Sequence, residues 1–302
     1  MVLNQLIFIT IFYLSTIYAN TSYPYLSGYT WLSFCDWRFI GDDYVGKREV
    51  FDPELVNEGD TIFIDSMILD EFISDYLPKI QYRVILVSAN YGFGSDHSLP
   101  GRFNYLLEDE KIAAWFVQNI DREPSDKLIP IPIGLASSNW AHGDTKMLDS
   151  LIPISLNKPR RKNFIYLNIT PRPERKKCIE HFTKLGTKFE SPKPFKHYLK
   201  DLSKSIFVIS PPGNGVDCHR TWEALLMGCY PVVESSTLNP LYQDLPIVII
   251  NNWEEVTEEF LHQKYLELSS KDWPRESLYA PYWFKRVRTL QNKLKQEKLD
   301  AT

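Results

Sequence analysis

Residues 210–234 read SPPGNGVDCHRTWEALLMGCYPVVE, and this stretch decides the fold of the C-terminal half of the chain. An apolar segment ending at Ser210 predicts a strand, the PPGNG run predicts a loop, and Asp217–Met227 predicts a helix. Gly228 falls where a helix C-terminus favours positive φ, and Tyr230–Glu234 predicts the next strand. This succession is a βαβ unit, so the two strands are expected to be parallel.

Strand-like and helix-like segments continue to alternate on both sides of this unit. In the C-terminal half, the further expected strands are Phe164–Asn168, Ile206–Ser210 and Ile247–Ile250, and the expected helices are Arg172–Leu185, Phe195–Ser203, Trp253–Leu268 and Pro281–Lys295. In the N-terminal half, the expected strands are Thr61–Met67 and Tyr82–Ser88, and the expected helices are Leu69–Ile80 and Leu106–Asn119. The prolines of Leu128–Leu135 favour an edge or extended segment.

The two alternating arrays indicate two domains. Residues 152–163, IPISLNKPRRKN, are rich in proline and basic residues and are expected to form a surface linker. We therefore predict an α/β fold with two Rossmann-like domains facing a cleft, over residues 20–151 and 160–272, followed by a C-terminal helix and tail over 273–302.

Composition narrows the possible partners. The formal net charge is -4 and no long basic run occurs, which argues against nucleic acid as a partner. Four cysteines without a Cys/His cluster argue against a structural zinc site, and Cys218 and Cys229 are expected to be buried core residues.

The first residues resemble a targeting segment. Leu6–Ala19 is an uncharged apolar run, so residues 1–19 are expected to be a signal peptide or a membrane anchor, with an ordinary buried segment as the other interpretation. Asn20 and Asn168 begin glycosylation sequons, which occur often by chance.

The PPGNG loop and the helix after it are suited to binding an anion. Gly213 and Gly215 allow the backbone to approach a ligand closely and to adopt conformations that other residues avoid. Asp217 is a good N-cap residue, and the helix N-terminus with Arg220 is a suitable place for a phosphate or diphosphate. The loop matches neither the G-x-G-x-x-G pattern, since position 218 is cysteine, nor the phosphate loop of nucleoside triphosphatases.

Arg220 and Glu223 share one face of this helix, whose other residues from Trp222 to Met227 are apolar and expected to be buried. One interpretation is that the two charges pair with each other at the surface. The other is that Arg220 faces phosphates while Glu223 accepts hydrogen bonds from the ribose hydroxyls of a nucleotide.

Residues 210–233, with Leu245–Val256, closely resemble the C-terminal half of the exostosin-like glycosyltransferase family. The similarity is strong over Phe164–Leu268, whereas the N-terminal half shows only ANYGFGSDHS and Ile131–Asp144. It implies the two-domain GT-B architecture and an inverting transfer from a nucleotide sugar, commonly a UDP-sugar, to a glycan or glycoconjugate acceptor. Residues 160–272 would then bind the nucleotide sugar and residues 20–151 the acceptor.

The resemblance extends to particular residues. The family's Arg followed by Glu falls on Arg220 and Glu223. In NITPRPERK, Arg175, in preference to Arg172, is expected to neutralise the leaving diphosphate, with an ordinary basic surface as the other interpretation. The expected residues of the nucleotide-sugar site are Arg175, Ser210, Gly213, Asn214, Gly215, Arg220 and Glu223. The resemblance implies a site without a bound metal, and the absence of an Asp-x-Asp triplet agrees with this; no other cofactor is expected.

An inverting transfer also needs a general base. Asp96, and after it His97, are the expected catalytic residues, in the loop after Tyr82–Ser88; His142 and Asp144 are the alternatives. For each of these four, ordinary hydrogen bonding within a loop is the other interpretation. Aromatic residues that could stack on the base or on acceptor sugars are Tyr91, Phe93, Trp140 and Trp253.

Together these features predict a glycosyltransferase of the secretory pathway lumen (ER or Golgi) or a secreted one, with membrane attachment through the N-terminal segment as a further option. The first alternative is a catalytically inactive nucleotide-sugar or glycan-binding protein of the same fold. The second is another α/β enzyme, such as a nucleotide-sugar phosphatase or epimerase, against which the missing carboxylate cluster and G-x-G-x-x-G argue.

Overall fold

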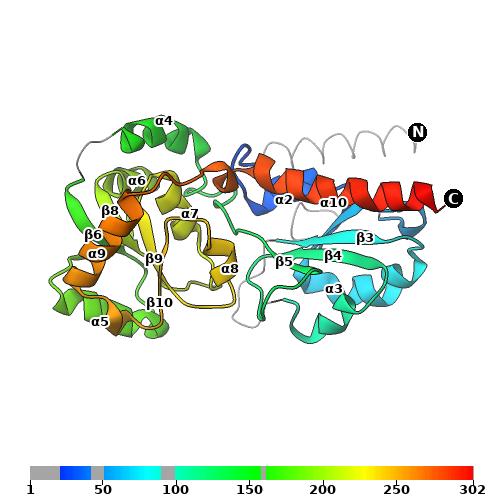
Figure 1. Cartoon of the computed structure of the whole chain (residues 1–302), viewed down its shortest axis with the longest axis horizontal. Helices are drawn as coiled ribbons and strands as arrows, with labels where there is room; N and C mark the ends of the chain where they lie inside the picture. Colours follow the sequence, from blue (N-terminus) through cyan, green and yellow to red (C-terminus); the bar gives the residue numbers. More distant parts are fainter. Residues whose placement is uncertain (1–20, 42–50, 90–98, 158–160, 302) are drawn as a thin grey trace. The chain divides into compact units, whose positions relative to one another are not determined.

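The computed structural model describes residues 21–41, 51–89, 99–157 and 161–301 (Figure 1). The chain divides into two compact units, one formed by residues 1–137 with 279–302 and the other by 138–278. Each unit contains one five-stranded parallel sheet. The expected α/β class is therefore confirmed, whereas a GT-B arrangement around a shared cleft stays a prediction.

In the N-terminal unit the strands lie in the order in which they occur along the chain. Every residue of β2 and β3 is buried, as the apolar centre of a parallel sheet requires. The proline-containing segment forms β5 at one edge of the sheet, as predicted. The elements are α2 (Gly28–Phe34), β1 (Trp37–Phe39), β2 (Thr61–Ile64), α3 (Leu69–Glu71), β3 (Val84–Ser88), β4 (Ile112–Val117), β5 (Leu128–Pro130) and α10 (Ala280–Asp300).

Two helix predictions in this unit need correction. Leu106–Asn119 is not a helix: a 3-10 helix over Gly101–Leu107 precedes β4, which pairs with both β3 and β5. A short apolar run fits a buried strand and a buried helix equally well, and only the pairing partners decide between them. Leu69–Ile80 is helical but irregular, since the short α3 passes into a π-helical and then a 3-10 turn.

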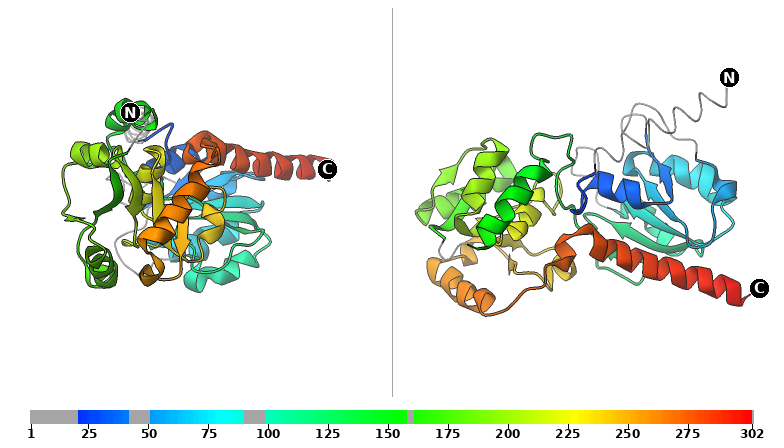
Figure 2. Two further views of the ribbon diagram at one scale, coloured as in Figure 1. Left: turned by 60° about the vertical axis from the view of Figure 1, so that its left-hand side comes forward. Right: turned by 90° about the horizontal axis from the view of Figure 1, so that it is seen from above.

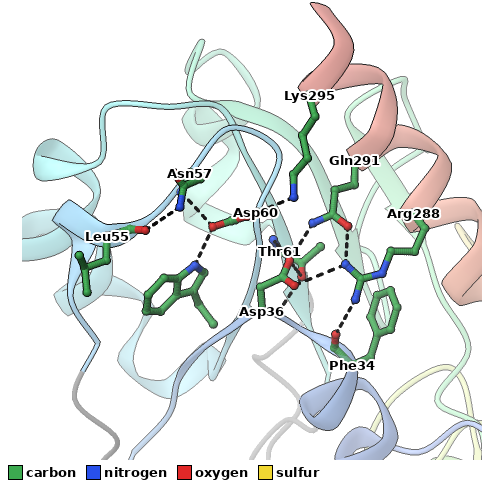
Figure 3. Close-up of polar contacts among 10 residues, drawn as sticks. Phe34, Asp36, Leu55, Asn57, Asp60, Thr61, Arg288, Gln291 and Lys295 are labelled. Carbon is green, nitrogen blue, oxygen red and sulfur yellow. Dashed lines mark hydrogen bonds and ion pairs between the residues drawn. The ribbon is translucent and has the colours of Figure 1, made fainter. Parts of the chain in front are cut away.

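The C-terminal helix α10 belongs to the N-terminal unit, and Figure 2 shows it as one continuous helix. Asp36, before β1, accepts hydrogen bonds from Thr61 and, at 2.8 Å, from Nε2 of Gln291 on α10 (Figure 3). Asp60, before β2, lies 3.6 Å from Nζ of Lys295. These contacts tie α10 to the amino ends of β1 and β2.

In the C-terminal unit the sheet order is β10-β9-β8-β6-β7. The predicted strands and helices of this half are confirmed within a few residues at their ends, and the two-residue β7 has no counterpart among the predicted strands. The elements are α4 (Thr145–Leu156), β6 (Asn163–Asn168), α5 (Lys176–Lys184), β7 (Phe189–Glu190), α6 (Phe195–Leu202), β8 (Ser205–Ile209), α7 (His219–Leu226), β9 (Tyr230–Glu234), α8 (Asn239–Tyr242), β10 (Val248–Ile250) and α9 (Glu258–Ser269).

The linker predicted over 152–163 is in part a helix, because α4 runs to Leu156 with Pro153 inside it. The end of α4 is anchored: Oγ of Ser155 is buried and donates to the carbonyl oxygen of Met227, at 2.6 Å. Gly228 has a φ of 70°, as its place after α7 predicted. A Cβ there would lie 2.8 Å from the Leu156 side chain, so packing as well as φ requires glycine.

The two faces of this sheet are covered by different helices. Residues of α5 and α9 join Leu167 and the strand residues beside it in one buried cluster. Tyr166 points to the opposite face, where it packs against Tyr198 of α6.

The cysteines at 35, 178, 218 and 229 are all buried and unbridged. Among the described residues, no helix combines the length and apolarity needed to cross a membrane.

Candidate functional site

The order of the C-terminal sheet marks one place for a ligand. From β6 the chain passes to β7 on one side, whereas from β8 it passes to β9 and β10 on the other, so the order reverses between β6 and β8. In open parallel sheets, ligands bind at the carboxyl ends of the strands at such a reversal. The two segments that meet there are 169–175 after β6 and 210–218 after β8. By contrast, the described strands of the N-terminal unit follow chain order and contain no reversal.

The loop after β8 is held rigidly. Ser210 is buried, and its Oγ lies 2.9 Å from Oγ1 of Thr221 on α7. Gly213 N donates to the Gly215 carbonyl oxygen at 2.8 Å. Neither glycine has positive φ, so the expectation of an unusual backbone conformation is wrong. Close approach is the reason for Gly213, since a Cβ there would lie 3.1 Å from Sγ of Cys218 and 3.2 Å from Nη2 of Arg175.

Three arginine side chains converge on this loop. Arg175 is 5% exposed; its Nε donates to the Pro212 carbonyl oxygen at 2.8 Å and its Nη1 to that of Thr170 at 3.0 Å. Arg220 Nη1 donates to the Pro211 carbonyl oxygen at 3.3 Å and to Ser210 Oγ at 3.4 Å. Arg172 Nη1 donates to Oδ1 of Asn214 at 2.8 Å. The structure thus brings both predicted arginines together with the four predicted residues of the loop, Ser210, Gly213, Asn214 and Gly215.

The charges of Arg175 and Arg220 are not neutralised by neighbouring acids. Within the described ranges neither arginine has a carboxylate oxygen within 4.0 Å, and Arg172 approaches only Glu174, at 3.9 Å. Burial, and then the positive charge of Arg220, lower the pKa of Arg175. Backbone carbonyls fix the guanidinium groups in place but leave net positive charge at the loop. An anion with several oxygens, such as a diphosphate, would satisfy it.

The start of α7 differs from the prediction. Cys218, not Asp217, is the N-cap residue, and its own side chain does not cap the first turn. Asp217 is 1% exposed and its carboxylate accepts hydrogen bonds from Nε1 of Trp222, at 2.8 and 2.9 Å, and from the hydroxyl of Tyr242, at 2.9 Å. Asp217 therefore contacts two aromatic side chains, one of them on α7, and does not act as the N-cap residue of that helix.

Glu223 lies in the second turn of α7 and is only 4% exposed. It does not form an ion pair with Arg220, so the interpretation of a surface pair is wrong. Burial raises the pKa of Glu223 to about 7, although the Tyr198 hydroxyl and the charge of Arg220 act in the opposite direction. The apolar residues around it, from Trp222 to Met227, are buried as predicted. A buried carboxyl group without a cationic partner is unusual in a purely structural role.

Of the candidate general bases, the structure describes only His142 and Asp144. Asp96 and His97, and the aromatic residues Tyr91 and Phe93, lie outside the described residues. Asp144 is the N-cap of α4, where Oδ1 accepts from the backbone N–H groups of Lys146 and Met147, so its carboxylate has a structural function.

The other candidates of that loop lie beside the start of α7. The His142 ring stands edge-on to Trp140, with centroids 5.3 Å apart, and lies 6.5 Å from the ring of His219, the first residue of α7. Burial lowers the pKa of His142, which favours the neutral form that can accept a proton. Trp253, by contrast, is 5% exposed and packs against Phe182, so its function is in the core.

Sequence reasoning missed two residues on this face, Tyr166 and Tyr198, because a tyrosine in a strand or an amphipathic helix normally indicates packing. The side chain of Asn168, which begins one of the two glycosylation sequons, is engaged inside the fold. Asn168 is 9% exposed, and its Nδ2 donates to the carbonyl oxygens of Glu190 and Ser191. A glycan on this nitrogen is incompatible with those contacts. Among the described residues, no group of three or more His, Cys, Asp or Glu side chains is arranged to hold a metal ion.

Fold and site together define a parallel α/β unit with a cluster of arginines at its topological switch point. Residues 155–299, a little under half of the chain, match the family described as the RXYLT1 C-terminal domain. The match covers the switch-point loops and α7 and supports a glycosyltransferase family.

No curated protein matches the sequence. Among solved structures, a chain described as "Crystal structure of GtfA/B complex" aligns with 9% sequence identity and a TM-score of 0.35. The alignment covers 79% of this chain and 55% of that one, so this chain spans about half of that chain's length.

Proposed function

We propose that this chain is an exostosin-like glycosyltransferase that takes a sugar from a nucleotide-sugar donor bound at the switch point of the C-terminal sheet. The observation that carries the proposal is Arg175, a buried guanidinium held by two backbone carbonyls at the glycine loop, with no carboxylate oxygen within 4.0 Å among the described residues. The match to the RXYLT1 C-terminal domain over the same segment supports it.

The nucleotide sugar, in our proposal a UDP-sugar, would lie with its diphosphate against Arg175, Arg220 and the Gly213 loop. Glu223, one helical turn beyond Arg220, would accept hydrogen bonds from the ribose. In an inverting transfer the acceptor hydroxyl oxygen bonds to the anomeric carbon as the bond from that carbon to the phosphate oxygen breaks. The arginines stabilise the negative charge that develops on the departing diphosphate.

The proton of the acceptor hydroxyl must pass to a general base. Asp96, and next His97, remain our first choices, with the acceptor glycan bound by the N-terminal unit. His142 is the alternative from the described residues, because it lies beside the first residue of α7 and its pKa is lowered. Replacing each in turn by alanine distinguishes them: the base variant should lose turnover while it retains affinity for UDP.

The proposal is tested by a thermal-shift screen of nucleotide diphosphates and nucleotide sugars, followed by assays of UDP release. Ligand at 100 times its Kd should add about 2.7 kcal/mol of stability. Stabilisation together with release of the nucleotide supports the transferase, and binding without turnover supports the inactive binding protein of the same fold. If no nucleotide binds, or if Arg175→Ala binds as tightly as the wild type, the site has been misassigned. Location in the secretory lumen, and membrane attachment through residues 1–19, belong to the same proposal.

A further inference from the structure

Two neighbouring tyrosine hydroxyls, one of them beside Glu223, meet hydrogen-bond geometry with no group among the described residues. Among the described residues only four buried side-chain polar atoms lack a partner, and two of them are the hydroxyl oxygens of Tyr166 and Tyr198. The two rings are neighbours, with centroids 6.2 Å apart, and the residues are 4% and 8% exposed. An unsatisfied buried hydroxyl costs about 1–3 kcal/mol, so two adjacent ones need an explanation.

The charged residues around Tyr166 are already paired and do not supply the missing contacts. Lys193 lies 6.0 Å from the centroid of the Tyr166 ring, and it is held by Glu190 and by Asp201, the latter at 2.7 Å. Burial raises the pKa of Tyr166, and the negative charges of Asp201 and then Glu190 raise it further. This ion group therefore lies beside the Tyr166 ring without forming a hydrogen bond to its hydroxyl.

Tyr198 lies against Glu223 on the other side. Burial and then Glu223 raise the pKa of Tyr198, although the two side chains do not meet hydrogen-bond geometry. Tyr198 is in the first turn of α6, and Glu223 is in the second turn of α7. Both helices begin at the carboxyl edge of the sheet, because each follows a parallel strand. Tyr198 and Glu223 therefore lie near the carboxyl ends of the strands. In this position they could contact the group that follows the diphosphate in a nucleotide bound at the loop.

The next group after the diphosphate in any nucleotide is the ribose. Glu223 follows Arg220 by three residues, a rise of about 4.5 Å along a helix, which matches the step from a phosphate to the sugar bonded to it. Each hydroxyl of a ribose can donate one hydrogen bond and accept others. A carboxylate accepts from such hydroxyls, and a phenol can donate to them, so the two protein groups are complementary to a 2′,3′-diol.

We propose that Tyr198, supported by Tyr166, acts with Glu223 to recognise the ribose diol and so makes the site selective for ribonucleotides over 2′-deoxyribonucleotides. This inference rests on the proposed function. The selectivity arises because a 2′-deoxyribose would leave the Tyr198 hydroxyl unpaired in the bound state as well as in the free state. A site built to bond a hydroxyl discriminates strongly against an analogue that lacks it.

The experiment compares UDP and 2′-deoxy-UDP by calorimetric titration of the full chain, its Tyr198→Phe and Tyr166→Phe variants, and a control. The control is Tyr242→Phe, because the Tyr242 hydroxyl is also buried but already donates to Asp217. If the thermal-shift screen selects another base, its ribo- and deoxyribonucleoside diphosphates replace this pair.

The wild type should bind UDP about 10- to 100-fold more tightly than 2′-deoxy-UDP. Tyr198→Phe should lose most of that ratio by weakening UDP alone, and Tyr166→Phe should shift it in the same direction. The melting temperature of the free Tyr198→Phe chain should not fall, because no hydrogen bond is lost, whereas that of Tyr242→Phe should fall.

Three results bear on the inference differently. Equal affinity of the wild type for both ligands, or an equal loss for both in Tyr198→Phe, overturns the inference and leaves the proposed function standing. A lower melting temperature of Tyr198→Phe with unchanged selectivity shows a structural hydroxyl and also overturns it. Failure of the wild type to bind any nucleoside diphosphate overturns the proposed function itself.

Discussion

The buried carboxyl group of Glu223 should make the folded C-terminal unit less stable as the pH rises, and Glu223→Gln should remove that effect. Glutamine has nearly the same shape but does not ionise. The pKa of Glu223 is raised by burial from its ordinary value of 4.5 to about 7. Below pH 4.5 the group is protonated in both the folded and the unfolded chain, so it contributes no pH dependence there.

Between pH 4.5 and 7 the folded chain keeps a proton that the unfolded chain has lost, so the stability of the wild type falls as the pH rises. Above pH 7 both states are ionised and the penalty is constant. The difference between the two pKa values corresponds to roughly 3 kcal/mol. Relative to the wild type, Glu223→Gln should therefore gain about 3 kcal/mol between pH 4.5 and pH 8.5.

The measurement is urea unfolding of both proteins at a series of pH values, followed by tryptophan fluorescence. The test uses only the way in which the difference in unfolding free energy between the two proteins changes with pH. New contacts of the glutamine amide add the same free energy at every pH. Glu190→Gln is a control of opposite sign: hydrogen bonds from Lys193 and Lys188 lower the pKa of Glu190, so the wild type gains stability from it as the pH rises through the acidic range. If the difference between Glu223→Gln and the wild type is constant across this pH range, Glu223 is not a buried neutral acid and the site geometry is wrong.

Three further outcomes are expected. Arg175→Ala should weaken UDP binding by about 10- to 100-fold, as loss of a charge-assisted contact implies, measured by calorimetry. Gly213→Ala should also weaken UDP binding, because the added Cβ would lie 3.2 Å from Nη2 of Arg175. Gly186→Ala is the control: its Cβ would have nothing within 4 Å, so it should keep its UDP affinity and lose only about 1–2 kcal/mol of stability because of its φ of 80°. Gln291→Leu removes the 2.8 Å hydrogen bond from α10 to Asp36, leaves only the 3.4 Å contact of Arg288 from that helix, and should lower the unfolding free energy by about 1–3 kcal/mol in urea titrations. Unchanged affinity in the first two variants, or unchanged stability in the third, would contradict these assignments.

The sequence by itself determined the elements of the C-terminal unit. Strand Tyr230–Glu234 and helix Phe195–Leu202 could be predicted because a local pattern, an apolar run or an amphipathic period, coincides there with turn residues at both ends. The glycine loop, Arg175, Arg220 and Glu223 could be predicted to share a site because they occur within two loop–helix segments of one βαβ series. These are short-range features, which a linear pattern records.

The N-terminal unit resisted the same reasoning. The sequence predicts Ile112–Val117 as part of a helix because a continuous apolar run has no period, and its identity as a strand depends on hydrogen bonds to β3 and β5. Likewise, nothing local to α10 indicates that Gln291 would bond Asp36, more than 250 positions away in the sequence. Pairings across such distances exist only in the folded chain.

Tertiary structure alone decided the chemistry of individual side chains. Asp217 looks like a helix cap in the sequence, but the packing of Trp222 and Tyr242 makes it the acceptor at the base of α7. Glu223 could be named from the sequence, yet its neutral tendency comes from burial, and the unpaired hydroxyls of Tyr166 and Tyr198 are visible only once α6 and α7 lie on the same face. Burial and pairing are properties of a residue's surroundings in space, and those surroundings are assembled from distant parts of the chain.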